Sequence, residues 1–226
     1  MMAEAQVLGI VLLSLQVSLV AMVFAIPLAF VVAWILARFE FGGKSLLQAL
    51  VTLPLVLPPV VTGYFLLLLF GRNGSLGMAL HSVGIDFAFK WTGAALAAAV
   101  MAFPLLVRPM RLSIESLDRG LEEAAATLGA NRVSRFFTIS LPLVLPGIIA
   151  GAVLGFAKAL GEFGATITFV SNIPGETQTL SLAIYSLLQS PSGDKAALIL
   201  IVVSVVLAVG SVVTSEWVAR RIGKDR

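Results

Sequence analysis

Five long stretches without charged side chains constrain what this chain can fold into. They are Ala5 to Ala37, Ser45 to Gly71, Trp91 to Val107, Phe136 to Ala157 and Ala196 to Ser215. A helix needs roughly 20 apolar residues to cross the hydrocarbon core of a bilayer, and only the third stretch is at the lower end of that range. None of them alternates polar and apolar residues with a period of two, as a membrane strand would. We therefore predict an all-α integral membrane protein with five transmembrane helices.

The composition excludes several other classes of protein. Charged residues make up 12% of the chain, whereas soluble domains contain about a quarter. The chain has no cysteine, which excludes a disulfide framework and cysteine-based metal sites. It also has no HExxH or Gly-x-Ser-x-Gly motif, so a membrane protease or lipase would lack its metal or its nucleophile. We expect no enzyme activity, no metal site and no bound cofactor, and the net charge of +3 requires no nucleic acid partner.

The placement of lysine and arginine predicts the orientation in the membrane. Positively charged loops preferentially face the cytoplasm. If the C-terminus is cytoplasmic, that side holds eleven such residues: Arg38, Lys44, Arg108, Arg111, Arg119, Arg132, Arg135, Arg220, Arg221, Lys224 and Arg226. The opposite side then holds three: Arg72, Lys90 and Lys195. We predict an external N-terminus and a cytoplasmic C-terminus (N-out, C-in).

The second apolar stretch contains a segment that cannot form a regular helix. Pro54, Pro58 and Pro59 remove three backbone donors within six residues. Irregular backbone at membrane depth is tolerated where it is buried in protein or lines a cavity. Two interpretations are therefore open: a kinked packing helix near one surface, or a segment that faces a pore. Thr52 and Thr62, which flank the prolines, are candidates for hydroxyl contacts along a translocation path.

A polar segment before the fourth apolar stretch differs from the rest of the chain. Asp118 is placed to cap the N-terminus of a helix, and Gly129 to end that helix in a left-handed conformation. Asn131 can cap the helix that follows. We predict a short surface helix, a sharp turn and a second helix. The acids Glu122 and Glu123 would face anionic headgroups unfavourably, which favours docking into a groove of another protein over an interfacial helix.

The same segment carries a pattern with fixed spacing. It reads Glu-Ala-Ala, three residues, Gly, nine residues, Ile, one residue, Leu-Pro. This layout, with both spacers, resembles the cytoplasmic signature of the permease subunits of ABC importers. In that family the segment docks into a cleft of a cytoplasmic ATPase and transmits its opening and closing. The resemblance implies a coupling loop at about 108–140, with these ATPase-coupling residues: Glu123, Ala124, Ala125, Gly129, Ile139, Leu141 and Pro142.

Three further segments narrow the resemblance within that family. Residues Gly161 to Thr166, Phe169 to Thr179 and Leu53 to Tyr64 are similar to the corresponding parts of molybdate permeases, and the similarity covers nearly the whole chain. Tungstate permeases resemble the chain closely as well. Sulfate permeases share the Gly-Glu-Phe-Gly core and an Asn-Ile-Pro, but they diverge after the proline. The resemblance implies molybdate as the transported anion, with tungstate or sulfate as alternatives.

The resemblance also implies an architecture and a set of partners. Residues 1–226 would form a single membrane domain with the type I ABC permease fold, in a bacterial or archaeal cytoplasmic (inner) membrane. Two copies would enclose one path, two ABC ATPase subunits would use ATP beneath them, and an external oxyanion-binding protein would deliver the anion. The alternative from another class is an ATP-independent secondary transporter. The absence of internal repeats argues against that alternative.

The fourth apolar stretch is predicted to continue as one span from about Leu141 to Val170. Gly147, Gly151 and Gly155 recur four residues apart, so they lie on one face of that helix. Small residues at this spacing let another helix approach closely. We expect tight packing there against a neighbour, which could be a second copy of the chain.

Two opposite charges, Lys158 and Glu162, lie well inside that predicted span. They are four residues apart and therefore share one helix face, and ionised groups in a membrane face the protein interior or water. The pair either orients the span, or Lys158 lowers the barrier for a dianion that Glu162 holds in place. The first interpretation is favoured because a path must release its cargo. Thr166 and Thr168 join the candidates for the path.

Overall fold

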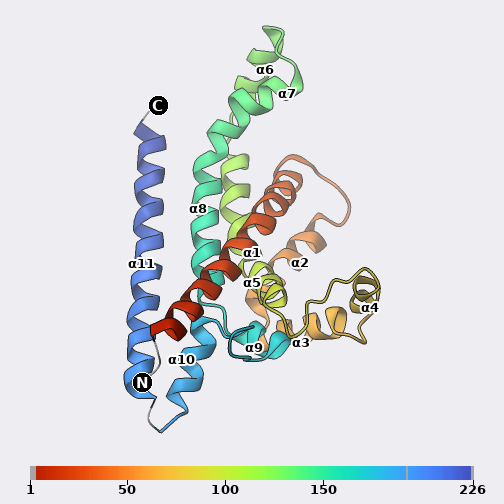
Figure 1. Ribbon diagram of the computed structural model, residues 1–226. Helices are drawn as coiled ribbons and strands as arrows, with labels where there is room; N and C mark the ends of the chain where they lie inside the picture. Colours follow the sequence, from red (N-terminus) through yellow and green to blue (C-terminus); the bar gives the residue numbers. More distant parts are fainter. Residues whose placement is uncertain (1–3, 192, 225–226) are drawn as a thin grey trace.

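The computed structural model describes residues 4–191 and 193–224, and that part of the chain is helical with no strand (Figure 1). The predicted all-α class is confirmed. The elements follow in order: α1 (Glu4–Arg38), α2 (Lys44–Val56), α3 (Pro59–Phe70), α4 (Ser75–His81), α5 (Trp91–Glu115), α6 (Arg119–Thr127), α7 (Arg132–Arg135), the π-helical turn η1 (Phe136–Ser140), α8 (Leu141–Leu160), α9 (Gly164–Val170), α10 (Leu180–Leu188) and α11 (Asp194–Lys224).

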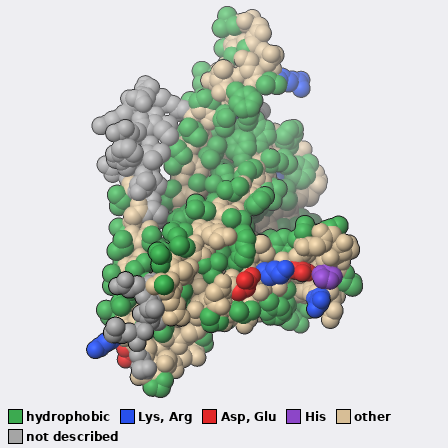
Figure 2. Space-filling view, viewed as in Figure 1, with side chains coloured by type: hydrophobic (Ala, Val, Ile, Leu, Met, Phe, Trp, Pro, Cys, Tyr) green, Lys and Arg blue, Asp and Glu red, His purple; other side chains and the backbone are tan. Residues whose placement is uncertain are grey.

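The core of the molecule lies where α1, α5 and α8 pack together, with α5 against both of the others. The buried side of α5 is rich in alanine, and Ala94, Ala97 and Ala102 are fully buried. Small side chains let helices approach closely in the absence of a hydrophobic driving force between them. The outside is apolar instead: leucines of α1 and its Phe24 are exposed, as expected for a surface that meets lipid (Figure 2).

Three helical stretches in the described part of the chain are long and apolar enough to cross a membrane. They are α1, α5 and the stretch from α7 to α8. The pair α2 and α3 adds a fourth if the two helices are counted as one broken span. The fifth predicted stretch lies in α11, a helix of 31 residues. The exact count of five spans stays a prediction.

The second predicted span is broken at Leu57 and Pro58, whereas Pro54, which we also expected to break the helix, lies inside α2. α2 and α3 are bent by 115° with respect to each other, and Leu57 and Pro58 between them adopt extended backbone conformations. Pro59 then occupies the first turn of α3, where its missing N–H costs no helical hydrogen bond. The segment is therefore a sharp corner, much stronger than the kink of a single packing helix.

The predicted continuous span from Leu141 to Val170 is wrong. α8 ends at Leu160, and a separate short helix, α9, begins at Gly164. The connecting residues leave helical geometry, and the Glu162 side chain accepts a hydrogen bond from the Ala165 N–H, in the first turn of α9, at 3.0 Å. A buried backbone donor needs such a partner because no water is at hand.

The two broken segments meet each other. Gly63 of α3 packs directly on the backbone of Ala165 in α9, and Gly164 packs on Pro59. The helices α3 and α9 make extensive contact along their lengths. The two corners, which lie about a hundred residues apart in the chain, therefore form one packed unit beside the α1–α5–α8 core.

The glycine face of α8 contacts α5 of the same chain. A Cβ at Gly147 would collide with Ser113, and a Cβ at Gly155 with Leu106. Gly151 lies against the Leu106 backbone. The predicted close packing is confirmed, and the neighbour is an internal helix.

We expect the substitution Gly63→Ala to destabilise the protein, because its Cβ would lie 2.4 Å from the Ala165 carbonyl oxygen. Overpacking of this kind costs about 1–3 kcal/mol. Gly9→Ala is the matched control, because Gly9 also lies in a helix but its new methyl group would meet no atom within 4 Å. Thermal unfolding of the purified protein in detergent measures both. Equal unfolding midpoints for the two variants would show that the α3–α9 contact is not tight.

Candidate functional site

The arm, residues 118–140, projects beyond the end of the helix bundle and connects α5 to α8 (Figure 1). Both predicted caps are present. Asp118 Oδ1 accepts a hydrogen bond from the Gly120 N–H at 2.8 Å, and Asn131 Oδ1 accepts one from the Ser134 N–H at 2.8 Å. Gly129 has a φ of 86°, the left-handed conformation that ends a helix. The arm is thus a helix, a tight turn and a second helix.

The arm presents its signature residues outward. Glu123, Ala124 and Gly129 are exposed, and Ala125 is half-buried. Two leucines are exposed as well: Leu121 in α6, by 48%, and Leu128 at the C-cap of α6, by 88%. An apolar face that its own chain leaves uncovered is typical of a surface that another protein covers.

The other signature residues form the junction between the arm and the membrane. Ile139 lies in the π-helical turn, and Leu141 and Pro142 begin α8; all three are half-buried. A π-helical turn inside a helix is rare and frequently occurs at functional sites. It lies where the arm meets the bundle. The signature residues therefore fall into two groups, an exposed helix and turn, and a half-buried junction.

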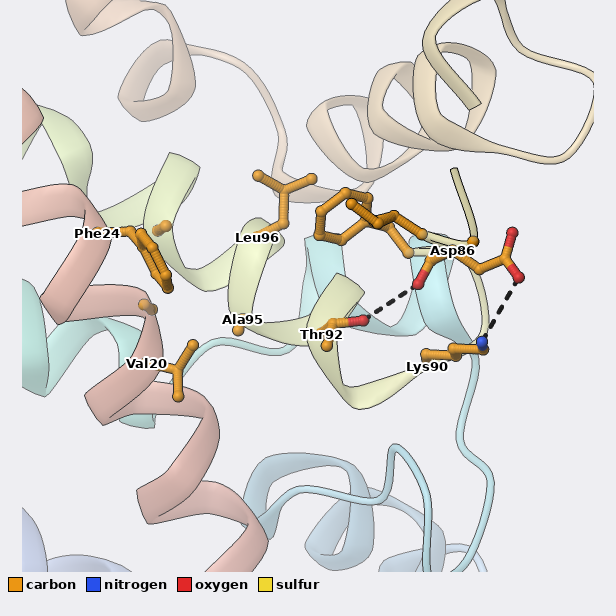
Figure 3. Close-up of a pocket in the computed structure, with 12 residues that line it drawn as sticks. Val20, Phe24, Asp86, Lys90, Thr92, Ala95 and Leu96 are labelled. Atoms are coloured by element: carbon orange, nitrogen blue, oxygen red, sulfur yellow. Dashed lines mark hydrogen bonds and ion pairs between the residues drawn. The ribbon is translucent and has the colours of Figure 1, made fainter. Parts of the chain in front are cut away.

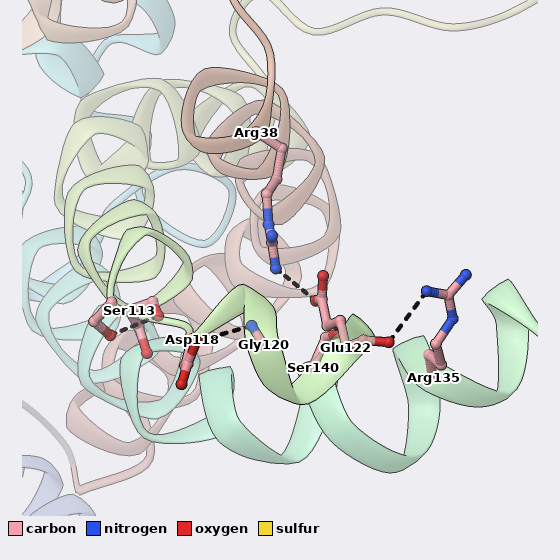
Figure 4. Close-up of polar contacts among 8 residues, drawn as sticks. Arg38, Ser113, Asp118, Gly120, Glu122, Arg135 and Ser140 are labelled. Carbon is pink, nitrogen blue, oxygen red and sulfur yellow. Dashed lines mark hydrogen bonds and ion pairs between the residues drawn. The ribbon is translucent and has the colours of Figure 1, made fainter. Parts of the chain in front are cut away.

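Glu122 binds the arm to the first helix of the chain. Its Oε1 lies 2.6 Å from Arg38 Nη2 and accepts a hydrogen bond from Ser140 Oγ at 2.6 Å. Arg135 Nη1 donates to the Glu122 carbonyl oxygen at 3.2 Å (Figure 4). We expected Glu122 to meet a groove of another protein, and that expectation is wrong, because the chain itself pairs it. Since 84 residues separate Arg38 from Glu122, no local pattern could reveal the pair.

The predicted ion pair between Lys158 and Glu162 forms. Lys158 Nζ lies 2.5 Å from Glu162 Oε2, and the Glu162 side chain is 1% exposed while that of Lys158 is 29% exposed. Glu162 therefore has two partners, the ammonium group on one oxygen and the Ala165 N–H on the other. This arrangement ties the end of α8 to the start of α9.

The four candidate threonines do not gather at one point. Thr62 and Thr166 are buried in the two packed helices α3 and α9. Thr168 donates to the Gly164 carbonyl oxygen at 2.9 Å. Thr52 is exposed on α2, across the corner, and its hydroxyl donates to the Gln48 carbonyl oxygen at 2.9 Å.

One of these threonines has an unused polar group. The buried Thr62 hydroxyl lacks a hydrogen-bond partner. A buried hydroxyl without a partner is costly, and this one lies beside the α3–α9 contact. Thr62 is therefore the strongest of the four threonine candidates for the translocation path.

A cavity of about 390 Å³ lies where α2 and α5 approach each other at the arm end of the bundle. Its polar lining consists of Gln48, Thr52, Arg108, Arg111 and Glu115. Arg111 Nη1 donates to Gln48 Oε1 at 2.9 Å. Arg111 Nε also pairs with Glu115 Oε1 at 2.7 Å, so the carboxylate offsets its positive charge. Thr52 therefore lies beside this cavity and away from the α3–α9 contact.

A second cavity, of about 540 Å³, is unsuited to an anion. It lies between α1, α5 and the loop after α4, and apolar side chains such as Phe24 and Leu96 line it (Figure 3). Asp86 lies at its edge, and a hydrogen bond from His81 holds the pKa of the Asp86 carboxyl below its usual value. The negative charge of Asp86 would repel an anion in this cavity, although Lys90 Nζ lies 3.5 Å from Asp86 Oδ2.

Neither cavity offers a metal site. In residues 4–191 and 193–224, no group of three or more histidine, cysteine, aspartate or glutamate side chains could hold a metal ion.

Comparison with known proteins assigns the chain to a family. The family described as "Binding-protein-dependent transport system inner membrane component" matches residues 7–224. The chain belongs to this family. It is accordingly a multi-pass protein of the inner membrane, and the expected localisation and the ABC permease resemblance are confirmed.

Individual relatives from this family cover most of the chain. The "Molybdenum transport system permease protein ModB" of Escherichia coli (strain K12) is 57% identical over 96% of this chain and 94% of its own. The relative of the same name in Haemophilus influenzae is 54% identical over 94% of this chain and 93% of its own. The "Sulfate transport system permease protein CysT" of Salmonella typhimurium is more distant, at 38% identity over 89% of this chain and 74% of its own.

Solved structures of ABC transporters share the fold. A bacterial ABC transporter involved in the import of alginate matches with a TM-score of 0.75 and 20% identity, covering 97% of this chain and 80% of the other. The MetNI methionine ABC transporter, in an inward-facing conformation, matches with a TM-score of 0.69 and 15% identity, covering 98% of this chain and 99% of the other. The helices of this family member therefore follow the arrangement of ABC importer permeases.

Proposed function

We propose that this chain is the permease subunit of an ATP-driven importer that carries molybdate into the cytoplasm. The observation that carries the proposal is the 57% identity, over 96% of the chain, to a permease named for molybdenum transport. The sulfate permease is only 38% identical, which favours molybdate over sulfate. Tungstate, which has the same shape and charge as molybdate, is the alternative anion.

The proposed assembly contains two copies of the chain, two ATPase subunits and an external oxyanion-binding protein. The exposed apolar face of α6, with Leu121 and Leu128, supports the ATPase contact. ATP would bind to the ATPase and not to this chain. A related alginate transporter has been solved with its periplasmic protein, which supports a binding-protein partner of the same kind.

The proposed orientation is N-out and C-in. Figure 1 supports it, because α1 begins at the end of the bundle opposite to the arm, while α11 ends on the side of the arm. In this orientation the arm lies in the cytoplasm, where an ATPase can reach it. Residues 1–226 then act as one membrane domain.

The proposed mechanism is a rigid-body movement of the helix bundle that the arm directs. ATP binding would draw the two ATPase subunits together, and each would carry one arm with it. The two corners, α2–α3 and α8–α9, would then change position relative to the corners of the second copy. Thr62 and Thr166 lie at this point and are the proposed contacts of the anion, with Thr168, Thr52, Lys158 and Glu162 as further candidates along the path.

The proposal predicts ATP-dependent uptake of molybdate. The chain, its ATPase and its binding protein, reconstituted in vesicles, should accumulate labelled molybdate only when ATP is supplied. Unlabelled tungstate should compete strongly and sulfate weakly. Uptake driven by an ion gradient without nucleotide would contradict the proposal and favour a secondary transporter, and stronger competition by sulfate than by molybdate would reassign the anion.

A further inference from the structure

We infer that Glu122 and Arg38 are positioning residues that make α1 move together with the arm. The inference rests on the proposed function, since it concerns how movement of the ATPase reaches the membrane helices. The chain itself joins the arm only to α5 and α8. The connection to α1 is non-covalent: Glu122 supplies its ion pair, and Phe136 packs against Trp34.

The connection is built to be rigid. A single oxygen, Glu122 Oε1, receives both the Arg38 guanidinium group and the Ser140 hydroxyl, each at 2.6 Å. Hydrogen bonds between charged groups are shorter and stronger than neutral ones. Because Ser140 lies in the π-helical turn, Glu122 fixes the docking helix α6, the turn η1 and the end of α1 at one point (Figure 4).

Aromatic packing holds Arg38 and the turn in place around this point. The Arg38 guanidinium carbon lies 5.1 Å from the ring centre of Trp34, and the Phe136 ring packs edge-on against Trp34 at 5.3 Å. The Arg38 side chain is 13% exposed, and its Nε has no hydrogen-bond partner. Glu122 is therefore the partner that compensates the buried charge of Arg38, and the pair is costly to separate.

The neighbouring acidic residues Glu122 and Glu123 of the arm have different roles. Consecutive residues of a helix point about 100° apart, so Glu122 faces the bundle while Glu123 is exposed. Glu123 belongs to the surface that meets the ATPase. Glu122 lies on the adjacent face of the same helix and joins that surface to the membrane helices.

A mechanical consequence follows. With the joint in place, the arm, α1, α5 and α8 form one body, because α1 also packs along α5 and α8. The α8–α9 corner moves with this body, because Glu162 ties the end of α8 to the start of α9. Without the ion pair, the aromatic packing of Phe136 on Trp34 and Phe30 is what remains between the arm and α1, and we expect ATP hydrolysis to drive transport less efficiently.

Two substitutions test the inference in the complete transporter. Glu122→Gln and Arg38→Met each remove the ion pair, and Glu122→Gln keeps an acceptor for Ser140. We expect both variants to co-purify with the ATPase and to hydrolyse ATP, while the number of ATP molecules hydrolysed per molybdate imported rises about tenfold. The matched control is Glu40→Gln, since Glu40 forms an ion pair of the same 2.6 Å length with Lys44 near the end of α1, but its side chain is 88% exposed. This control should keep the wild-type ratio.

A crosslink provides the rescue. The chain has no cysteine, so a double variant Arg38→Cys/Glu122→Cys, paired with a cysteine-free ATPase, carries two unique thiols. We expect it to be uncoupled until a short bifunctional thiol reagent bridges the two positions, and coupled afterwards. A loss of coupling caused by misfolding would not recover in this way.

The possible outcomes separate the inference from the proposed function. If the wild-type complex does not import molybdate with ATP, the proposed function fails. If the wild type imports molybdate and both single variants keep its ATP-to-molybdate ratio, the inference is wrong. It is equally wrong if the variants fail to hold the ATPase, or if the crosslinked double variant stays uncoupled.

Discussion

Replacing Gly129 with aspartate is expected to abolish transport and to uncouple the ATPase. Gly129 forms the turn between the two helices of the arm with a φ of 86°, a conformation that disfavours side chains with a Cβ. The new carboxylate would also lie at the C-terminal end of α6, where the helix dipole disfavours negative charge. Finally, a cleft that closes around the turn would have to desolvate this charge. Together, these effects should weaken docking by about 3 kcal/mol or more, roughly a hundredfold.

The chain offers a matched control for this substitution. Gly43 also has a left-handed φ, of 96°, and, like Gly129, it has open space around its Cβ position. It follows α1, whose end contacts the arm, so it lies on the same side of the bundle. Gly43→Asp should therefore keep most of the transport. Molybdate uptake and co-purification of the ATPase measure both variants, and wild-type uptake by Gly129→Asp would refute docking at this turn.

Much of the arm was predictable from the sequence because its signals are local. A cap such as Asp118 acts on an N–H two residues away, and Gly129 determines its own backbone conformation, so both were correct. The partner of Glu122 was not predictable, because Arg38 lies 84 residues earlier in the chain. Such a contact depends on how α1 packs, and no periodicity records it.

The corners of the membrane helices show the same difference between local signals, which the sequence reveals, and long-range contacts, which it does not. The prolines predicted the corner between α2 and α3, because the missing backbone N–H of a proline is a local property of the sequence. The second corner, at Gly161 to Phe163, carries no proline, and its glycines resemble those that pack α8 against α5. The second corner is stabilised by the Glu162 side chain, which accepts a hydrogen bond from an N–H in the first turn of α9. We predicted that Glu162 pairs with Lys158, and the pair is confirmed, but its role in ending a helix depends on tertiary structure.

Replacing Lys158 with methionine is expected to destabilise the folded protein strongly. Glu162, with its side chain 1% exposed, would keep only the Ala165 N–H as a partner. Removing one member of a buried ion pair costs about 3–5 kcal/mol, because the remaining charge has neither water nor a counter-ion. Thermal unfolding in detergent should therefore show a clear drop in the midpoint. An unchanged midpoint would mean that the pair contributes nothing to the fold.

The double variant Lys158→Met/Glu162→Gln decides between the two roles of the pair. Glutamine carries no charge, and its oxygen can still accept the Ala165 N–H, so we expect most of the stability to return. If the pair only holds α8 against α9, molybdate uptake should return with it. If the stability returns and uptake does not, the anion needs the Lys158 charge itself. The structure favours the first result, because Glu162 already neutralises Lys158 at 2.5 Å, and a cation with a fixed counter-ion offers little attraction to a passing dianion.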